Sequence, residues 1–239
     1  MLPETKEWKK GMNVNDLKSV SINDLLPRNE INVDLKSVGA MLKGKKILIT
    51  GSAGSIGSEM VRQIATFAPE AMMLIDQAET PQHDMKLLMQ NKFPNVRCNV
   101  VLMSISNQAR MERLFSEFRP DYVFHAAAYK HVPMMEENPS ESIQNNIYGT
   151  KVVADLSVKY GVKKFVMIST DKAVNPTNVM GCSKRICEIY TQALNAKLVK
   201  EYEANGSKGE VPTQFVTTRF GNVLGSTGSV IPLFEKQIK

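Results

Sequence analysis

The chain has 239 residues, of which 43% are hydrophobic and 23% are charged, and its formal net charge is +6. This composition is typical of a folded globular protein and excludes a disordered or fibrous chain. No run reaches the roughly 18 consecutive apolar residues of a membrane helix, and the N-terminus lacks the apolar core of a signal peptide. We therefore predict no membrane contact by this chain itself.

The cysteines and the basic residues exclude further classes of protein. Three cysteines, none of them in a CxxC pair, argue against a disulfide framework and a structural zinc site, and favour reduced thiols in the cytoplasm. The basic residues are mixed with acids and do not form an aromatic-rich stripe, so we predict no nucleic-acid partner.

The hydrophobic pattern changes near residue 43. Residues 1–42 show little periodicity and are predicted to form a linker or N-terminal arm with at most short helices. From residue 43 to residue 239, short apolar runs alternate with amphipathic stretches, which indicates a Rossmann-like α/β fold with a doubly wound parallel sheet. The predicted strands are residues 47–50, 71–76, 99–103, 122–125, 165–169 and 215–218. The predicted helices are residues 55–67, 81–91, 107–118, 140–160 and 178–200.

The first predicted strand runs into a GxxGxxG sequence that opens the first predicted helix. In dinucleotide-binding folds these glycines allow a tight turn, a close approach of the backbone to the diphosphate, and close packing of helix on strand. The helix N-terminus offers N–H groups and partial positive charge to the phosphates. No Gly-Lys-Ser/Thr closes the loop, which argues against a kinase-type P-loop. The predicted diphosphate-binding residues are Gly51, Gly54, Ser55, Ile56 and Gly57.

Asp76 ends the second predicted strand. A carboxylate at this place accepts hydrogen bonds from the adenosine ribose hydroxyls and repels a 2′-phosphate, so the predicted cofactor is NAD rather than NADP. The alternative to this interpretation is a glycine-rich turn that binds nothing.

Small residues follow the fourth predicted strand, where Ala126 begins a run of three alanines. At the carboxyl end of a parallel strand, such residues let a flat cofactor lie against the backbone, although tight packing alone also explains them. His125 and His131 are not at metal-ligand spacing with a carboxylate or thiolate, so no metal site is predicted.

Thr170, Asp171 and Lys172 follow the fifth predicted strand and should lie at the carboxyl edge of the sheet, where open α/β folds bind ligands. An adjacent carboxyl and amine can serve there as general acid and general base. The alternative is a solvated pair in a loop. Farther along, Met180 and Lys184 are one helical turn apart and share a helix face.

Four longer motifs allow a more specific interpretation of the function. The segments HAAAYKHVPMME from His125, NIYGT from Asn146, STDKAVNPTN from Ser169 and RFGNVLGS from Arg219 accompany the glycine loop. Together they resemble the CapD-like polysaccharide-biosynthesis family of nucleotide-sugar 4,6-dehydratases, within the extended short-chain dehydrogenase/reductase superfamily. The resemblance covers about residues 43–239.

The resemblance implies an enzyme that converts UDP-N-acetylglucosamine to its 4-keto-6-deoxy derivative for surface polysaccharide or glycan synthesis, with NAD taking a hydride from C4 and returning it to C6. In this scheme Lys172 removes the C5 proton, and a protonated Asp171 donates to the departing C6 hydroxyl. Lys184 contacts the nicotinamide ribose, and Thr170 is the candidate acceptor of the O4 proton. The resemblance also implies that Lys130 contacts cofactor and substrate, and that the substrate is further bound by His131 and Asn222.

Two residues depart from the superfamily pattern. Met180 stands where most members have a tyrosine, and a thioether can neither give nor take a proton. The larger, membrane-anchored branch of the dehydratase family also has methionine there, so the resemblance places the chain in that branch, which retains configuration at C5. Ser104 stands where many relatives have an aspartate near the adenine.

The resemblance also implies that this chain is one part of a longer protein. Long members of the family have an N-terminal membrane region and continue past the part seen here, so we expect the cytoplasmic part of an inner-membrane protein with its substrate-binding C-terminal part largely missing. Two alternatives stay open: a catalytically silent NAD-binding module, and a nucleotide-sugar 4-epimerase. The oligomeric state also stays open, although homo-oligomers are common in the superfamily.

Overall fold

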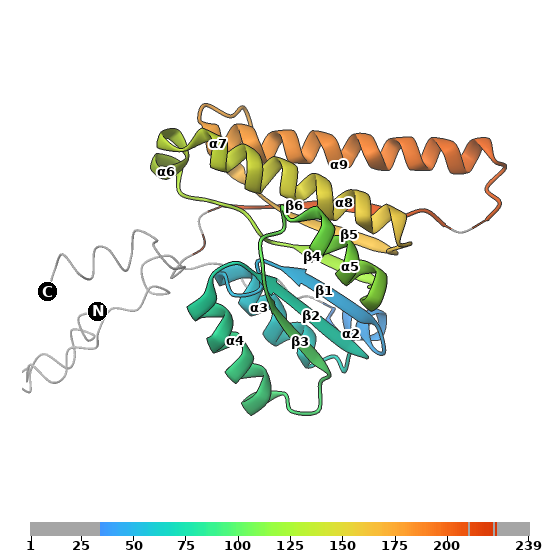
Figure 1. The fold of residues 1–239 in the computed structure, drawn as a ribbon. Helices are drawn as coiled ribbons and strands as arrows, with labels where there is room; N and C mark the ends of the chain where they lie inside the picture. The colour runs from blue at the N-terminus through green and yellow to red at the C-terminus, as the bar shows by residue number, and fades with distance from the viewer. Residues whose placement is uncertain (1–33, 210, 222, 224–239) are drawn as a thin grey trace, which may run out of the picture.

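A computed structural model describes residues 34–209, 211–221 and 223. Its six strands form one parallel sheet in the order β3-β2-β1-β4-β5-β6 (Figure 1). This is the strand order of doubly wound dinucleotide-binding folds, so the predicted fold class is confirmed. The strands are β1 (Lys46–Thr50), β2 (Ala71–Asp76), β3 (Cys98–Leu102), β4 (Tyr122–His125), β5 (Lys164–Thr170) and β6 (Gln214–Phe220).

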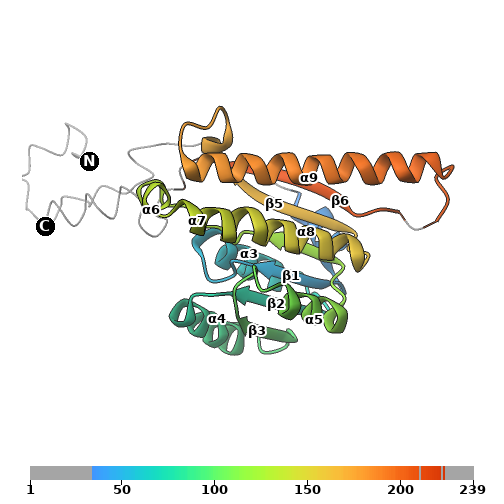
Figure 2. The same ribbon diagram turned by 45° about the horizontal axis from the view of Figure 1, so that its top comes forward.

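Helices connect the strands and cover both faces of the sheet, with α8 and α9 lying side by side over one face (Figure 2). None of the helices in the described part of the chain is long and apolar enough to cross a membrane. The helical segments are α2 (Leu35–Leu42), α3 (Ser55–Ala65), α4 (Glu79–Lys92), α5 (Gln108–Phe118), α6 (Val132–Glu137), α7 (Pro139–Ser142), the π-helix η3 (Ile143–Tyr148), α8 (Gly149–Lys159), the 3₁₀ helix η4 (Asp171–Ala173) and α9 (Val179–Ala204).

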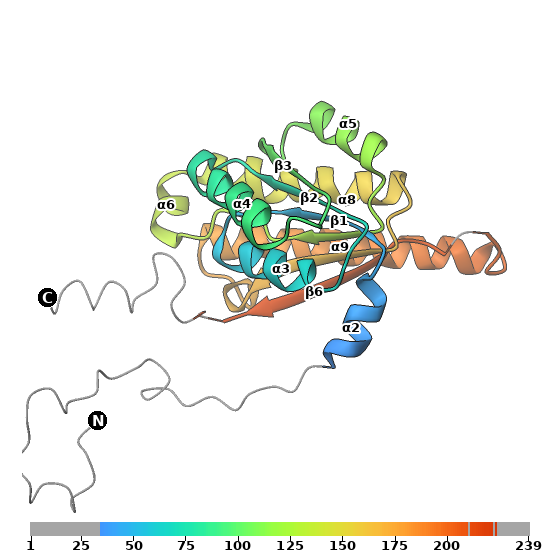
Figure 3. The same ribbon diagram turned by 90° about the horizontal axis from the view of Figure 1, so that it is seen from below.

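The core has two halves, one on each face of the sheet. Along β1, Ile47 and Ile49 point to the face covered by α2, α3 and α4 (Figure 3), whereas Leu48 points to the face covered by α5, α8 and α9. All three side chains are fully buried. Because both faces are covered, the three central positions of the strand are all apolar, which explains the continuous apolar runs in the sequence.

Several segments differ locally from the sequence-based expectations. The stretch predicted as one helix over residues 140–160 consists of α7, η3 and α8, with a π-helical turn in its middle. The short segments α6 and η4 were not predicted, because three to six residues show no helical periodicity. Within the predicted arm, α2 buries Leu42 in the core. The division of the chain at residue 43 stays a prediction, and residues 1–33 lie outside the described residues.

A buried histidine ties the end of β4 to β1 and α8. His125 Nδ1 lies 2.7 Å from Thr50 Oγ1, and its Nε2 lies 2.8 Å from Thr150 Oγ1. Burial, together with the nearby positive charge of Lys184, lowers the pKa of His125 to about 3. The ring is therefore neutral at physiological pH and serves as a hydrogen-bonded link between three elements.

This link predicts a sensitivity to acid. The unfolded histidine takes up a proton near pH 6.5 but the folded one only near pH 3, so stability should fall as the pH drops through this range. The loss is up to about 1.4 kcal/mol per pH unit. We expect His125→Gln to be less stable than the wild type at pH 7 but to lose less stability on acidification, as measured by urea denaturation from pH 7 to 4. His83→Gln, at an exposed position of α4, is the control and should keep the wild-type slope.

Candidate active site

The carboxyl ends of the parallel strands meet at one edge of the sheet, and the strand order reverses between β1 and β4. The glycine loop follows β1, Asp76 ends β2, the alanine run follows β4, and residues 171 and 172 follow β5. This edge is where open α/β folds bind ligands. The structure thus gathers at one edge most of the residues that the sequence singled out.

Gly51, directly after β1, lies against the backbone that follows β4. Its φ is +69°, a conformation that L side chains rarely adopt. A Cβ at Gly51 would lie 2.5 Å from the Ala127 backbone nitrogen and 2.6 Å from the Ala126 carbonyl carbon. Glycine at position 51 therefore lets the loop lie directly against the backbone of the alanine run. A contact of Ala126 with a cofactor stays a prediction.

The other two loop glycines meet different constraints. A Cβ at Gly57 would lie only 1.9 Å from the Gly51 carbonyl oxygen, so the first turn of α3 packs directly on the end of β1. A Cβ at Gly54 would lie 3.4 Å from the same oxygen, an ordinary contact. Gly54 is the N-cap of α3 and offers no side-chain oxygen, and the first turn, with Ser55 and Ile56, carries no acid. The positive end of this helix suits a diphosphate.

Asp76 links the end of β2 to the glycine loop. Its Oδ2 accepts a hydrogen bond from the Ala53 backbone N–H at 3.0 Å, and its Oδ1 accepts one from the Ala78 N–H at 2.9 Å. These bonds orient a half-buried carboxylate beside the loop. Each carboxylate oxygen can accept a further hydrogen bond, so Asp76 can still accept hydrogen bonds from ribose hydroxyls.

The Asn146 side chain joins two parts of the site. From the sequence, this residue was noted only as the first member of the NIYGT motif. Its Oδ1 accepts from the Tyr129 N–H at 2.8 Å, and its Nδ2 donates to the Tyr129 carbonyl at 3.1 Å and to Ser183 Oγ at 3.0 Å. The side chain is fully buried in the π-helical turn. Asn146 therefore fixes the loop before Lys130 against the first turns of α9.

Thr170, Asp171 and Lys172 form a hydrogen-bonded series at the end of β5. Thr170 Oγ1 donates to Asp171 Oδ1 at 2.8 Å, and Lys172 Nζ lies 3.1 Å from the same oxygen. The Thr170 hydroxyl and the Lys172 amine hold the pKa of Asp171 below its usual value. Without substrate, the Asp171 carboxylate is exposed and stabilised as an anion, and its role as the acid of the elimination stays a prediction.

The first turn of α9 packs against this series. A Cβ at Gly181 would lie 2.2 Å from the Lys172 carbonyl oxygen, so the close approach requires glycine. Glu136 Oε1 accepts a hydrogen bond from the Val179 N–H at 2.7 Å, which holds the start of α9 to α6. Neither Gly181 nor Glu136 was predicted to matter, because each acts on a segment distant in sequence.

Met180 and Lys184 both point inward from α9. Met180 is 3% exposed and Lys184 is 5% exposed. Burial lowers the pKa of Lys184, and the negative charge of Glu188 opposes that effect. The Lys184 amine, one turn below Met180, is thus held within the protein, next to the end of β4 that carries His125.

The structure says less about the remaining predicted site residues, which are Lys130, His131 and Asn222. Lys130 and His131 are exposed on the loop between β4 and α6, and their contacts with a ligand stay predictions. Asn222 lies outside the described residues. Across the residues that the structure describes, no group of three or more His, Cys, Asp or Glu side chains is placed to hold a metal ion.

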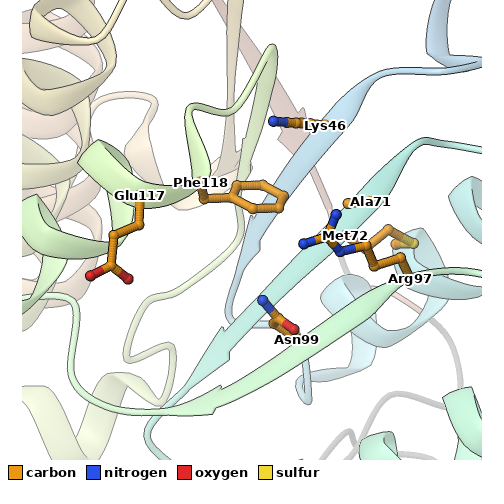
Figure 4. A pocket seen from close by; sticks show the side chains of 7 residues that line it. All are labelled: Lys46, Ala71, Met72, Arg97, Asn99, Glu117 and Phe118. Atoms are coloured by element: carbon orange, nitrogen blue, oxygen red, sulfur yellow. The ribbon is translucent and has the colours of Figure 1, made fainter.

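A hollow at the opposite edge of the sheet does not belong to this site (Figure 4). It lies at the amino ends of β1, β2 and β3, next to the end of α5. It is lined by Lys46, Ala71, Met72, Arg97, Asn99, Glu117 and Phe118.

The fold and the carboxyl-edge residues define a Rossmann protein with a dinucleotide-binding loop. A family model described as "Polysaccharide biosynthesis protein" matches residues 47–239, and the chain belongs to this family. The chain is 46% identical over 229 residues to the capsular polysaccharide biosynthesis protein CapD of Staphylococcus aureus, a match that covers 95% of this chain and 36% of CapD. The family resemblance inferred from the motifs is therefore confirmed.

Two further relatives are enzymes by name. The chain is 38% identical over 200 residues to an inverting UDP-N-acetylglucosamine 4,6-dehydratase of Campylobacter jejuni, with coverage of 83% and 55% of the two chains. It is 35% identical over 203 residues to a UDP-glucose 4-epimerase of Rickettsia felis, again with coverage of 83% and 55%. The chain thus spans 36% to 55% of the length of these curated relatives.

Solved structures agree with the fold. Pen from Bacillus thuringiensis matches with a TM-score of 0.71 and 36% identity, covering 82% of this chain and 58% of that chain. WbmG from Bordetella bronchiseptica, whose structure contains NAD and UDP, matches with a TM-score of 0.62 and 25% identity, covering 80% and 59%.

The loop geometry predicts unequal effects of two similar substitutions. Gly57→Ala places a Cβ against backbone and should weaken NAD⁺ binding at least about tenfold, a loss of about 1.4 kcal/mol. Gly54→Ala adds the same methyl group at ordinary contact distance and should change the affinity much less. Calorimetric titration with NAD⁺ measures both. Equal affinities for the two variants would contradict this account of the loop.

Proposed function

We propose that this chain carries the catalytic core of an NAD-dependent enzyme that removes water from UDP-N-acetylglucosamine to give the 4-keto-6-deoxy sugar, for surface polysaccharide or glycan synthesis. The observation that carries the proposal is the hydrogen-bonded series of Thr170, Asp171 and Lys172 at the carboxyl edge. Oxidation at C4 needs one proton acceptor. Elimination also needs a base for the C5 proton and an acid for the C6 hydroxyl.

The cofactor side of the proposal rests on the glycine loop. Gly51 and Gly57 allow the close backbone contacts that shape the loop, the N-terminus of α3 lies at the loop, and Asp76 lies beside it with acceptor capacity for a ribose. The related fold of WbmG was solved with NAD and UDP, which supports the same cofactor and a uridine nucleotide here. When bound, NAD⁺ supplies the redox chemistry, oxidising C4 and later reducing C6 of the same sugar.

Thr170 and Asp171 provide a path for the O4 proton. The Thr170 hydroxyl accepts this proton as C4 is oxidised and passes its own proton to Asp171 Oδ1, 2.8 Å away. Asp171, an anion at the start, becomes the acid that the elimination needs. It then donates to the departing C6 hydroxyl, which leaves as water. This order of proton transfers explains how a carboxyl group with a lowered pKa can still act as an acid.

Lys172 acts as the base at C5. An amine takes a proton only when it is neutral, so this step requires that the Lys172 ammonium, paired with Asp171 in the described structure, has first given a proton to solvent. Lys172 removes the C5 proton, and the same proton or one exchanged with solvent returns to C5 when C6 is reduced. The lysine starts and ends neutral and Asp171 starts and ends ionised, so one water molecule is the net product besides the sugar.

Lys184 and Met180 have supporting positions. Lys184, buried on α9, would donate hydrogen bonds to the nicotinamide ribose and place positive charge near the reacting carbon. Met180 packs at the site without exchanging protons. The proton work is therefore assigned to the segment after β5 and not to α9.

The alternatives make different predictions. An epimerase oxidises the same carbon but returns the hydride to C4, so the sugar keeps its oxygen atoms, and it has no need for an elimination acid and base. One curated relative is a UDP-glucose 4-epimerase, which keeps this alternative testable. A silent module would bind NAD⁺ and leave the sugar unchanged.

Mass spectrometry in deuterated buffer tests the proposal. After incubation with NAD⁺ and UDP-N-acetylglucosamine, we expect the product to have lost one water and gained deuterium at C5. An isomer of unchanged composition would support the epimerase. An unchanged sugar, both with this chain and with a chain extended at its C-terminus, would support the silent module.

The same assay tests the role of Lys172. Lys172→Ala should abolish deuterium incorporation at C5 and lower product formation by about 10²- to 10⁴-fold, the usual contribution of a general base. Lys92→Ala, at the exposed end of α4, removes the same side chain away from the site and should behave as the wild type. Unchanged incorporation in Lys172→Ala would assign the C5 proton to another group.

A further inference from the structure

Glu188 carries a buried negative charge on α9. It is fully buried, and both of its carboxylate oxygens accept hydrogen bonds. Arg219 Nε donates to Oε1 at 2.8 Å and Arg219 Nη2 donates to Oε2 at 2.6 Å, while Arg185 Nη1 donates to Oε2 at 3.0 Å. Burial alone would raise the pKa of Glu188, but the hydrogen bonds, first among them those from Arg219, lower it to about 2. The group is a permanent anion held by two arginines.

The two arginines reach this carboxylate from different elements. Arg185 lies three residues earlier on α9, so its ion pair stays within one helix. Arg219 lies on β6, where the strand register pairs it with Ser169 of β5. Of the two ion pairs, only the one between Arg219 and Glu188 connects the sheet to α9.

The tie lies between two groups that the proposed reaction needs. In the described sheet β6 is at the end of the strand order and pairs with β5. The next pair in the register joins Phe220 to Thr170, where the proton path begins. On the other side, Glu188 follows Lys184 by one helical turn and shares its helix face. A shift of Arg219 would therefore change the distance between Thr170 and Lys184.

We propose that Glu188 and Arg219 are positioning residues whose two-pronged ion pair fixes the end of the β5–β6 ladder against α9. The pair thereby sets the Thr170–Lys172 segment relative to Lys184, without touching the substrate. The kinetic consequence rests on the proposed function. The consequence for β6 itself does not, because it follows from the contacts alone.

Three variants separate positioning from general stability. Arg219→Met removes both hydrogen bonds to the carboxylate, Arg219→Lys keeps the charge but loses the planar fork, and Arg185→Met removes a cation from the same carboxylate while leaving β6 tied. We expect kcat to fall roughly 10- to 100-fold in Arg219→Met, as for a misplaced catalytic group. The loss should be smaller in Arg219→Lys and smallest in Arg185→Met. The Kd for NAD⁺ should change much less than kcat in all three, because the glycine loop follows β1, which β4 and β5 separate from β6.

Hydrogen exchange gives a second, activity-independent measurement. Backbone amides of β6 should exchange faster in Arg219→Met than in Arg185→Met, under conditions where circular dichroism shows both to be folded. Equal losses of kcat in these two variants, or a loss of NAD⁺ affinity that matches the loss of kcat, would overturn the proposal. If the wild type does not act on UDP-N-acetylglucosamine, the proposed function fails, and the exchange comparison still decides: unchanged β6 exchange in Arg219→Met would refute positioning.

Discussion

The contact between the ends of β1 and β4 is the constraint on which the site depends. A Cβ at Gly51 would lie 2.5 Å from the Ala127 backbone, and the 2.7 Å hydrogen bond between His125 and Thr50 joins the same strand ends. Because the strand order reverses at this point, the contact places the glycine loop, the first turn of α3 and the loop toward Lys130 together. Any larger side chain at Gly51 would separate the two strands and with them the two sides of the site.

The catalytic side is assembled by a second set of close contacts around α9. Gly181 packs on the Lys172 carbonyl, Glu136 holds the Val179 N–H, and Asn146 binds Ser183. These contacts converge on the first turn of the helix, which also carries Met180. In the proposed mechanism the absence of a tyrosine at that position is tolerable, because the hydroxyl, carboxylate and amine of residues 170–172 would form a proton path at the end of β5. We thus propose that the proton chemistry takes place at a strand end and that the helix positions the groups involved.

The sequence predicted the elements and residues whose signals are local. The bounds of β2 and β4 were predicted to the residue, because each is a buried apolar run with polar residues beside it. The glycine loop and the Thr170–Lys172 segment were predicted because each motif is contiguous. The contacts of Asn146 with Tyr129, of Glu136 with Val179 and of Arg219 with Glu188 were not, since they join residues 17, 43 and 31 positions apart. A single sequence carries no sign of which distant polar residues meet, and the ionised state of Asp171 likewise depends on the orientation of its neighbours.

The central claim is that cofactor and catalytic groups share the carboxyl edge of this sheet. Amide hydrogen exchange with and without NAD⁺, followed by mass spectrometry, tests it most directly. The account predicts protection in the glycine loop, at Asp76, in the alanine run after β4 and in the segment from Thr170 to Lys172, with none at the amino-edge hollow around Lys46 and Arg97. Protection confined to that hollow, or spread evenly over the sheet, would contradict the account.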